Sequence, residues 1–132
     1  MKRYFCRTLF LGWLFLLCTG AAQAQADNLG AVGSALRNGS SRELSQYFAS
    51  TVEIGFDDRQ SYNSTQAELV MKDFFSKNAP NTFEFIHQGQ SGEGIQYAIG
   101  RYTGRSGTYR VFVKLKPSRG APMIDALDFT KE

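Results

Sequence analysis

Asp125 is the residue of this sequence whose neighbours most suggest chemistry. In an extended strand its side chain points to the same face as those of Met123 and Leu127. If that face lines an apolar interior, desolvation raises the pKa of the carboxyl group and suits it to abstract a proton or to hold a ligand. Three other arrangements stay open: Asp125 lies at the mouth of that interior, it pairs with a basic residue on a neighbouring strand, or the face of Ile124 and Ala126 points inward instead.

His87 and several tyrosines are the other candidates. His87 is the single histidine of the sequence and alternates with Phe83 and Phe85, so it either faces the same interior or is a partly buried core residue. We therefore take Asp125 and His87 as the candidate catalytic residues. Core packing alone would also explain the tyrosines. The candidate ligand-binding residues are large apolar or aromatic side chains: Tyr47, Phe74, Phe85, Tyr97, Tyr109 and Leu127.

Three helices and a strand are predicted in the first half of the chain. The first helix covers about residues 27–37. The pair Ser40 and Glu43 fits a capping box for a second helix, whose apolar residues continue to Phe48 at helical spacing. A strand over residues 51–56 follows. A third helix then begins with a capping box formed by Thr65 and Glu68.

The chain after Pro80 alternates in polarity as strands do. The connections between these strands are too short for crossover helices, so we expect an antiparallel sheet and the α+β fold class, with the N-terminal helices packed on the sheet. The four predicted strands are residues 82–88, 95–103, 108–116 and 123–129.

The first 24 residues have the pattern of a secretory signal peptide. Three basic residues within the first seven precede an apolar run over residues 9–17, and Ala22-Gln23-Ala24 fits a cleavage site. The run is about half of the ~20 residues that span a bilayer, so no membrane-spanning helix is expected. We expect an exported protein, periplasmic or extracellular, in which residues 25–132 form one domain.

Composition excludes several kinds of site from that domain. Both cysteines, Cys6 and Cys18, belong to the leader, which excludes disulfides and cysteine nucleophiles and is typical of bacterial exported proteins. A single histidine excludes a multi-histidine metal centre, and we expect neither a metal nor a cofactor. Without the three basic residues of the leader, the net charge of +3 falls to zero, which argues against nucleic acid as a partner.

A basic stripe near the C-terminus suggests a surface for partners. Arg110, Lys114 and Lys116 share one face of a predicted strand, and Phe112 lies between them. Such a face could be solvated, could bind anionic glycans or lipid headgroups, or could pack on a second copy of the chain. We expect a homodimer through Arg110, Phe112 and Lys114, because an outward phenylalanine suits a contact between two sheets.

The order of the predicted elements resembles the nuclear transport factor 2-like superfamily, in which a curved sheet wraps a long helix into a cone with an open mouth. Within it, the chain resembles a bacterial family of small exported proteins. Three segments after the leader carry this resemblance: ELSQYF at 43–48, MKDFF at 71–75 and YRVFVK at 109–114. The resemblance implies a pocket between helices and sheet, but no particular reaction, because the fold hosts isomerases, dehydratases, transport factors and binding modules.

Two functions are compatible with these observations. The first is a non-catalytic exported domain that binds a small apolar ligand or a protein partner. The second is a cofactor-free isomerase or lyase acting on a small hydrophobic substrate, with Asp125 as base and His87 or a tyrosine as electrophile. We favour the first, because the sequence after the leader contains no motif for a nucleophile–base pair or a phosphate-binding loop.

Overall fold

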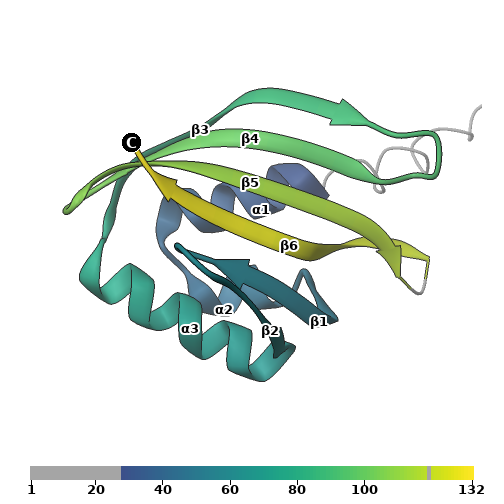
Figure 1. The fold of residues 1–132 in the computed structure, drawn as a ribbon, viewed down its shortest axis with the longest axis horizontal. Coiled ribbons are helices and arrows are strands. Elements are labelled where there is room, and N and C mark those ends of the chain that lie inside the picture. Colours follow the sequence, from purple (N-terminus) through teal and green to yellow (C-terminus); the bar gives the residue numbers. More distant parts are fainter. Residues whose placement is uncertain (1–27, 119) are drawn as a thin grey trace, which may run out of the picture.

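The computed structural model describes residues 28–118 and 120–132, so the predicted leader at residues 1–24 lies outside the described residues. Over these ranges three helices accompany a six-stranded sheet (Figure 1). The elements in chain order are α1 (Asn28–Asn38), α2 (Ser41–Ser45), β1 (Phe48–Gly55), β2 (Arg59–Asn63), α3 (Ser64–Lys77), β3 (Pro80–Gln90), β4 (Gln96–Gly104), β5 (Gly107–Ser118) and β6 (Ala121–Lys131).

The second helix is shorter than its apolar spacing predicts. Ser40 caps α2 by accepting a hydrogen bond from the Glu43 amide at 3.1 Å, as expected. The helix nevertheless ends at Ser45, and Phe48 begins β1. The Tyr47 carbonyl accepts a hydrogen bond of 2.6 Å from the Ile124 amide of β6. The backbone after Ser45 therefore forms hydrogen bonds with a strand that is distant in the sequence, in place of the bonds of a longer helix.

The N-cap of the third helix lies two residues earlier than predicted. Asn63, not Thr65, is the N-cap: its side chain accepts from the Gln66 amide at 2.8 Å, and the Gln66 side chain accepts from the Asn63 amide at 3.2 Å. Asn63 is extended because it is also the last residue of β2, a strand that the sequence pattern did not reveal. The buried face of α3 is formed by Ala67, Met71, Phe74 and Phe75.

The sheet is mixed, which corrects the prediction of a purely antiparallel one. Its strand order is β2-β1-β6-β5-β4-β3, and β1 pairs with β6 in parallel while every other pair is antiparallel. The connection from β1 to β6 contains α3 and four strands, which gives the chain ample length to return in the parallel direction. The α+β class itself is confirmed: helices precede a curved, open sheet.

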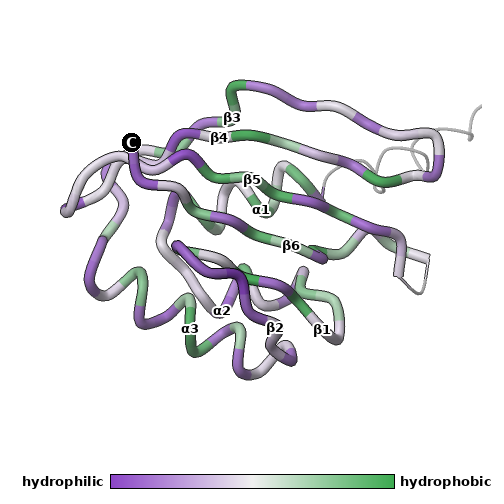
Figure 2. The backbone as a smooth tube through the Cα atoms, in the orientation of Figure 1, coloured by the Kyte–Doolittle hydropathy of each residue, from purple (hydrophilic) through white to green (hydrophobic). Residues whose placement is uncertain are grey.

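One face of the sheet is covered by the helices, and we call it the inner face; the opposite face is the outer face. The apolar core lies on the inner face, where Figure 2 shows hydrophobic stretches along the central strands. On β5, Val111, Val113 and Leu115 alternate with the residues predicted to share the outward face, and they are fully buried, which confirms the alternation of this strand. Helix α1 packs against β3, and α3 packs against β1 and β2.

Two of the register shifts in the sheet decide which face the candidate catalytic residues occupy. In β3, Phe85 pairs with Gly100 but His87 pairs with Ile99, so Ile86 is bulged. Such a bulge reverses the faces that the following side chains occupy.

The register shift that concerns Asp125 lies in β6. Ile124 pairs with Leu115 and Ala126 pairs with Lys114, so Asp125 is the extra residue. Ile124 is fully buried on the inner face together with Leu127, although strict alternation places them on opposite faces.

Candidate functional site

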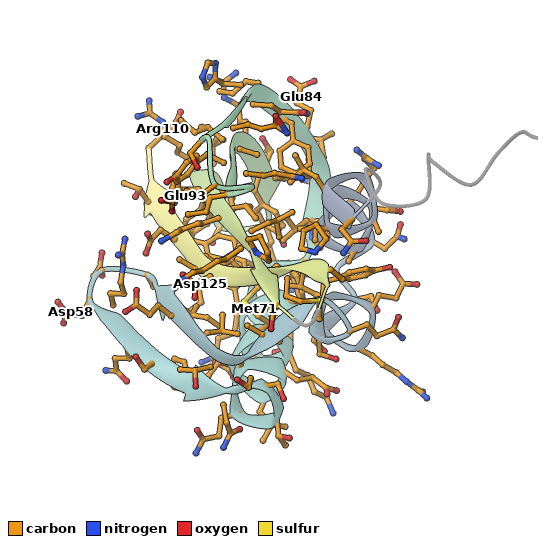
Figure 3. All side chains as sticks on the ribbon, turned by 90° about the vertical axis from the view of Figure 1, so that its right-hand side faces the viewer. Asp58, Met71, Glu84, Glu93, Arg110 and Asp125 are labelled. Carbon is orange, nitrogen blue, oxygen red and sulfur yellow. The ribbon has the colours of Figure 1, made fainter. Side chains whose placement is uncertain are left out.

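Asp125 lies on the outer face of the sheet. Its Oδ2 atom is 3.4 Å from Nζ of Lys114 on β5, and the two side chains are 32% and 30% exposed. Figure 3 shows Asp125 and Arg110 on the side of the sheet away from α1, and Met71 among the interior side chains. The structure therefore has the arrangement in which Asp125 pairs with a base on a neighbouring strand, and Asp125 lines neither of the two cavities described below.

His87 also lies on the outer face, apart from the two phenylalanines with which it alternates in sequence. The bulge at Ile86 pairs His87 with Ile99, whereas Phe83 and Phe85 pair with inner-face positions of β4. The imidazole is exposed to solvent. Asp125 and His87 are thus not brought together in an interior pocket, because one bulge displaces each of them from the face that sequence alternation assigned.

The six predicted ligand-binding residues are distributed over four different surroundings. Phe74 and Tyr109 line one cavity and Phe85 lines another. Leu127 is fully buried in the core, and Tyr47 packs against the core. The sixth, Tyr97, lies on the outer face, with its ring centroid 5.9 Å from that of Phe112.

The space between α3 and the sheet is filled by aromatic rings. Phe74 of α3 is the centre of this packing, with ring centroids at 4.7 Å from Phe129, 5.1 Å from Phe56, 5.4 Å from Tyr109 and 5.5 Å from Tyr102. Phe56 and Phe74 are stacked, while Tyr109 meets Phe74 edge-on at 77°. The open volume therefore lies at the end of the cone and not inside it.

We call this open volume the mouth cavity; it has a volume of about 580 Å³. It lies where α3, the segment after β1, the start of β5 and the end of β6 meet, at the left of Figure 1. This size is within the range of small-molecule pockets in proteins. Its apolar lining consists of Phe56, Leu69, Val70, Phe74 and Tyr109.

Charged side chains of both signs surround the apolar lining. Asp73 and Lys77 of α3 form an ion pair of 3.1 Å four residues apart, and both are largely exposed. Asp57 and Lys131 also contribute to the lining. A ligand in the mouth cavity would therefore meet aromatic rings at one end and charged groups at the other.

A chain of hydrogen bonds around Asn78 fixes the polar side of the mouth cavity. The Asn78 Nδ2 atom donates to the Phe74 carbonyl at 3.3 Å, so Oδ1 is the atom that faces Ser106. Because Oδ1 can only accept, Ser106 donates its hydroxyl proton to Asn78. Tyr109, whose oxygen is 3.2 Å from that of Ser106, must then donate to Ser106. The Tyr109 oxygen keeps its capacity to accept a further hydrogen bond.

Tyr102 adds a further hydrogen bond to this group from the core side. Its side chain is fully buried, and its hydroxyl donates to the Asn78 carbonyl. Burial raises the pKa of Tyr102, because the phenolate form loses its hydration, and the neighbouring Tyr109 raises it further. Tyr102 is therefore a neutral donor at physiological pH.

Sequence reasoning missed part of the mouth cavity. Leu69 lies off the apolar stripe of α3 and is 61% exposed, so its signal was an isolated large aliphatic residue on a polar helix face. Lys131 lies beyond the predicted last strand at residues 123–129, and no sequence pattern marked Asn78 as a cavity residue. Among residues 28–118 and 120–132, no group of three or more potential metal ligands lies together, and none of the helices is long and apolar enough to span a membrane.

Comparison with known proteins places this geometry in a family. The family model described as "Domain of unknown function (DUF4783)" matches residues 29–130. The chain belongs to the DUF4783 family. This membership confirms the resemblance to a bacterial family. The resemblance to the nuclear transport factor 2-like superfamily is supported by fold alone.

Solved structures agree with the assignment. A DUF4783 family protein from Bacteroides ovatus is 29% identical with a TM-score of 0.74, and the match covers 77% of this chain and 93% of that one. One from Bacteroides uniformis is 25% identical with a TM-score of 0.74, covering 78% and 95%.

A more distant neighbour shows the fold alone. It is an NTF-2 like protein from Silicibacter pomeroyi, 11% identical with a TM-score of 0.58, and the match covers 79% of this chain and 89% of that one. None of the curated proteins matches this DUF4783 chain.

Proposed function

We propose that this DUF4783 domain is an exported, non-catalytic binding domain that holds a small amphipathic molecule in the mouth cavity. The observation that carries the proposal is the corner formed by Phe56, Phe74 and Tyr109 beside an open volume of about 580 Å³. Exposed aromatic and aliphatic groups in a hollow gain free energy by covering themselves with an apolar ligand. The export part of the proposal rests on the leader pattern of residues 1–24.

The polar groups of the cavity suggest the shape of the ligand. Its apolar part would rest on the rings of Phe56 and Phe74, and its polar part would face the charged groups of Asp57 and Lys131. The Tyr109 oxygen would accept a hydrogen bond from a hydroxyl or amine of the ligand, since its own proton is directed to Ser106.

Binding without turnover is favoured over the isomerase or lyase alternative by the positions of the candidate catalytic residues. Asp125 is paired with Lys114 on the outer face, and His87 is exposed on the same face. An acid–base reaction on a ligand in the mouth cavity would need a group within hydrogen-bond reach of that ligand. Neither residue is part of the cavity lining.

The two exposed large aliphatic residues provide a matched test. Leu69 lines the mouth cavity and is 61% exposed, whereas Ile86 is 48% exposed and lines neither cavity. We expect Leu69→Asp to weaken binding of the amphipathic dye 1-anilinonaphthalene-8-sulfonate about tenfold, through lost apolar contact and added negative charge. Ile86→Asp adds the same charge elsewhere and should leave dye binding unchanged.

Fluorescence titration measures both variants against the unmodified protein, and native mass spectrometry of the purified protein reports any molecule that stays bound. Equal dye affinities for all three proteins, or an equal loss in the two variants, would show that the mouth cavity is not the binding site.

A second proposal concerns self-association, because the outer face carries an apolar patch of its own. Tyr97, Ile99 and Phe112 are half-buried on this face, and the rings of Tyr97 and Phe112 pack together. Basic side chains flank the patch, with Arg110 and Lys114 close to the acidic Glu132 and Asp125. Charges of both signs around an apolar centre suit a symmetric contact with a second copy.

A further inference from the structure

We propose that a second hollow, at the opposite end of β4 from the mouth cavity, binds a neutral saccharide. We call it the glutamine hollow. It has a volume of about 600 Å³ and lies between the start of α1 and the β3–β4 hairpin, at the right of Figure 1. Its side-chain lining consists of Leu29, Phe85, Gln88, Gln90 and Gln96, and the backbone of Gly30 and Gly89 completes it.

The bulge at Ile86 brings the three glutamines to one surface. After the bulge, Gln88 pairs with Ala98, a fully buried inner-face residue, and Gln90 pairs with Gln96. All three side chains thus belong to the inner face, which is apolar elsewhere. Without the extra residue, alternation from Phe85 would have placed His87 and Gly89 there instead. Figure 2 shows that this half of β3 is predominantly hydrophilic.

Helix α1 covers the inner face as far as Phe85 and leaves the three glutamines uncovered. Gly33 lies directly against the Phe85 ring: a Cβ at Gly33 would be 2.7 Å from Phe85 Cε2. The first turn of α1 then forms one wall of the hollow through Leu29 and Gly30. The inner face beyond Phe85 is therefore concave and bears amides where a core would bear apolar groups.

The lining favours a neutral ligand rich in hydroxyl groups. Each glutamine amide offers two donor hydrogens and an acceptor oxygen, which matches the paired donor and acceptor character of sugar hydroxyls. Within the described residues, none of the three amides hydrogen-bonds to another protein group, and no lining side chain is charged. The partly exposed Phe85 ring offers an apolar surface for the C–H groups of a pyranose ring.

Nuclear magnetic resonance of the side-chain amides tests this directly in ¹⁵N-labelled protein that retains every described residue. The probes are maltose, cellobiose and N,N′-diacetylchitobiose, with digalacturonate as an anionic comparison and tetraalanine amide as a peptide comparison. We expect at least one of the neutral disaccharides to shift the NH₂ signals of Gln88, Gln90 and Gln96 saturably at millimolar concentration. The NH₂ signal of Asn78 in the mouth cavity should stay in place, so the result is independent of the function proposed above.

Substitution then locates the site. Replacing Gln90 and Gln96 together by leucine keeps the side-chain size but removes both amides, and should weaken binding about tenfold or more. Gln46→Leu is the matched control, because Gln46 is exposed and lines neither cavity, and it should bind as the unmodified protein does. Gln96→Asn withdraws the amide by one methylene and should weaken binding in the same direction if the leucine pair does not fold.

Several results would overturn the proposal. These are the absence of a saturable shift with all three neutral disaccharides, tighter binding of digalacturonate or of tetraalanine amide, and an equal loss of affinity in the Gln46→Leu control. Binding that appears only after removal of the residues before Asn28 would equally overturn it, because the hollow would then be closed in the natural protein.

Discussion

At the scale of single residues, Tyr102 supports the floor of the mouth cavity. It is fully buried, packs edge-on against Phe129, and donates a hydrogen bond to the Asn78 carbonyl. Asn78 in turn accepts from Ser106, which orients Tyr109 at the cavity surface. A substitution at Tyr102 should therefore change both the free energy of unfolding and the orientation of Tyr109 in the cavity lining.

We predict that Tyr102→Phe lowers the free energy of unfolding by about 1 kcal/mol at neutral pH, the net contribution of one hydrogen bond. Burial raises the pKa of Tyr102 above its ordinary value of 10.0, so the folded state holds this proton more tightly than the unfolded state. The contribution is thus complete below pH 10 and is lost as the pH rises further. Urea unfolding of both proteins at neutral pH and above pH 10 measures this.

The expected outcome of that comparison is a difference between the two proteins that shrinks in alkali, because the Tyr102 phenol ionises in the unfolded state of the unmodified protein while it stays protonated in the folded state. A constant or growing difference would contradict the assigned pKa direction.

At the scale of elements, close packing between neighbouring strands decides where side chains fit. Gly100 of β4 lies beneath the Phe83 ring: a Cβ there would be 2.5 Å from Phe83 Cζ and 3.0 Å from the Glu84 carbonyl oxygen. Gly89 of β3 is different, because a Cβ at that position would meet no atom within 4 Å. The two glycines form a natural pair for comparison.

We predict that Gly100→Ala destabilises the protein by about 1–3 kcal/mol, the usual cost of overpacking, whereas Gly89→Ala changes stability by less than about 1 kcal/mol. The midpoints of urea unfolding compare the two variants. Equal stabilities would mean that Phe83 moves aside without cost and that this packing does not constrain β4.

The elements also show which features the sequence could predict. The inward residues of β5 were predicted correctly because its alternation is unbroken from Tyr109 to Leu115. Alternation left the faces of His87 and Asp125 open, and the structure places both on the outer face because His87 follows a bulge and Asp125 forms one. A bulge depends on the pairing partner as well as on the bulged strand, so local periodicity does not reveal it.

At the scale of the whole molecule, the outer face bears on assembly. Phe112 is half-buried there although none of the helices within residues 28–118 and 120–132 covers this face, and a second copy would complete its burial. We predict that Phe112→Glu converts a dimer to a monomer, because a carboxylate would have to be desolvated in the contact. Light scattering of the two proteins at equal concentration measures the mass. An unchanged mass would exclude Phe112 from the interface, and a monomeric unmodified protein would exclude the dimer.

The sequence by itself determined the α+β class, the three helices, the strand character of the C-terminal half and the resemblance to the family to which the chain belongs. It also identified Phe74 and Tyr109, which do line the mouth cavity. These features follow from local periodicity and residue type, which are properties of short segments.

Only the tertiary structure decided where the two hollows lie, that β1 and β6 run parallel, and that Asp125 pairs with Lys114. A hollow is the volume left over when side chains from several distant segments have packed. Its position therefore depends on strand register and on ring contacts such as those of Phe74, which are established only when the segments meet.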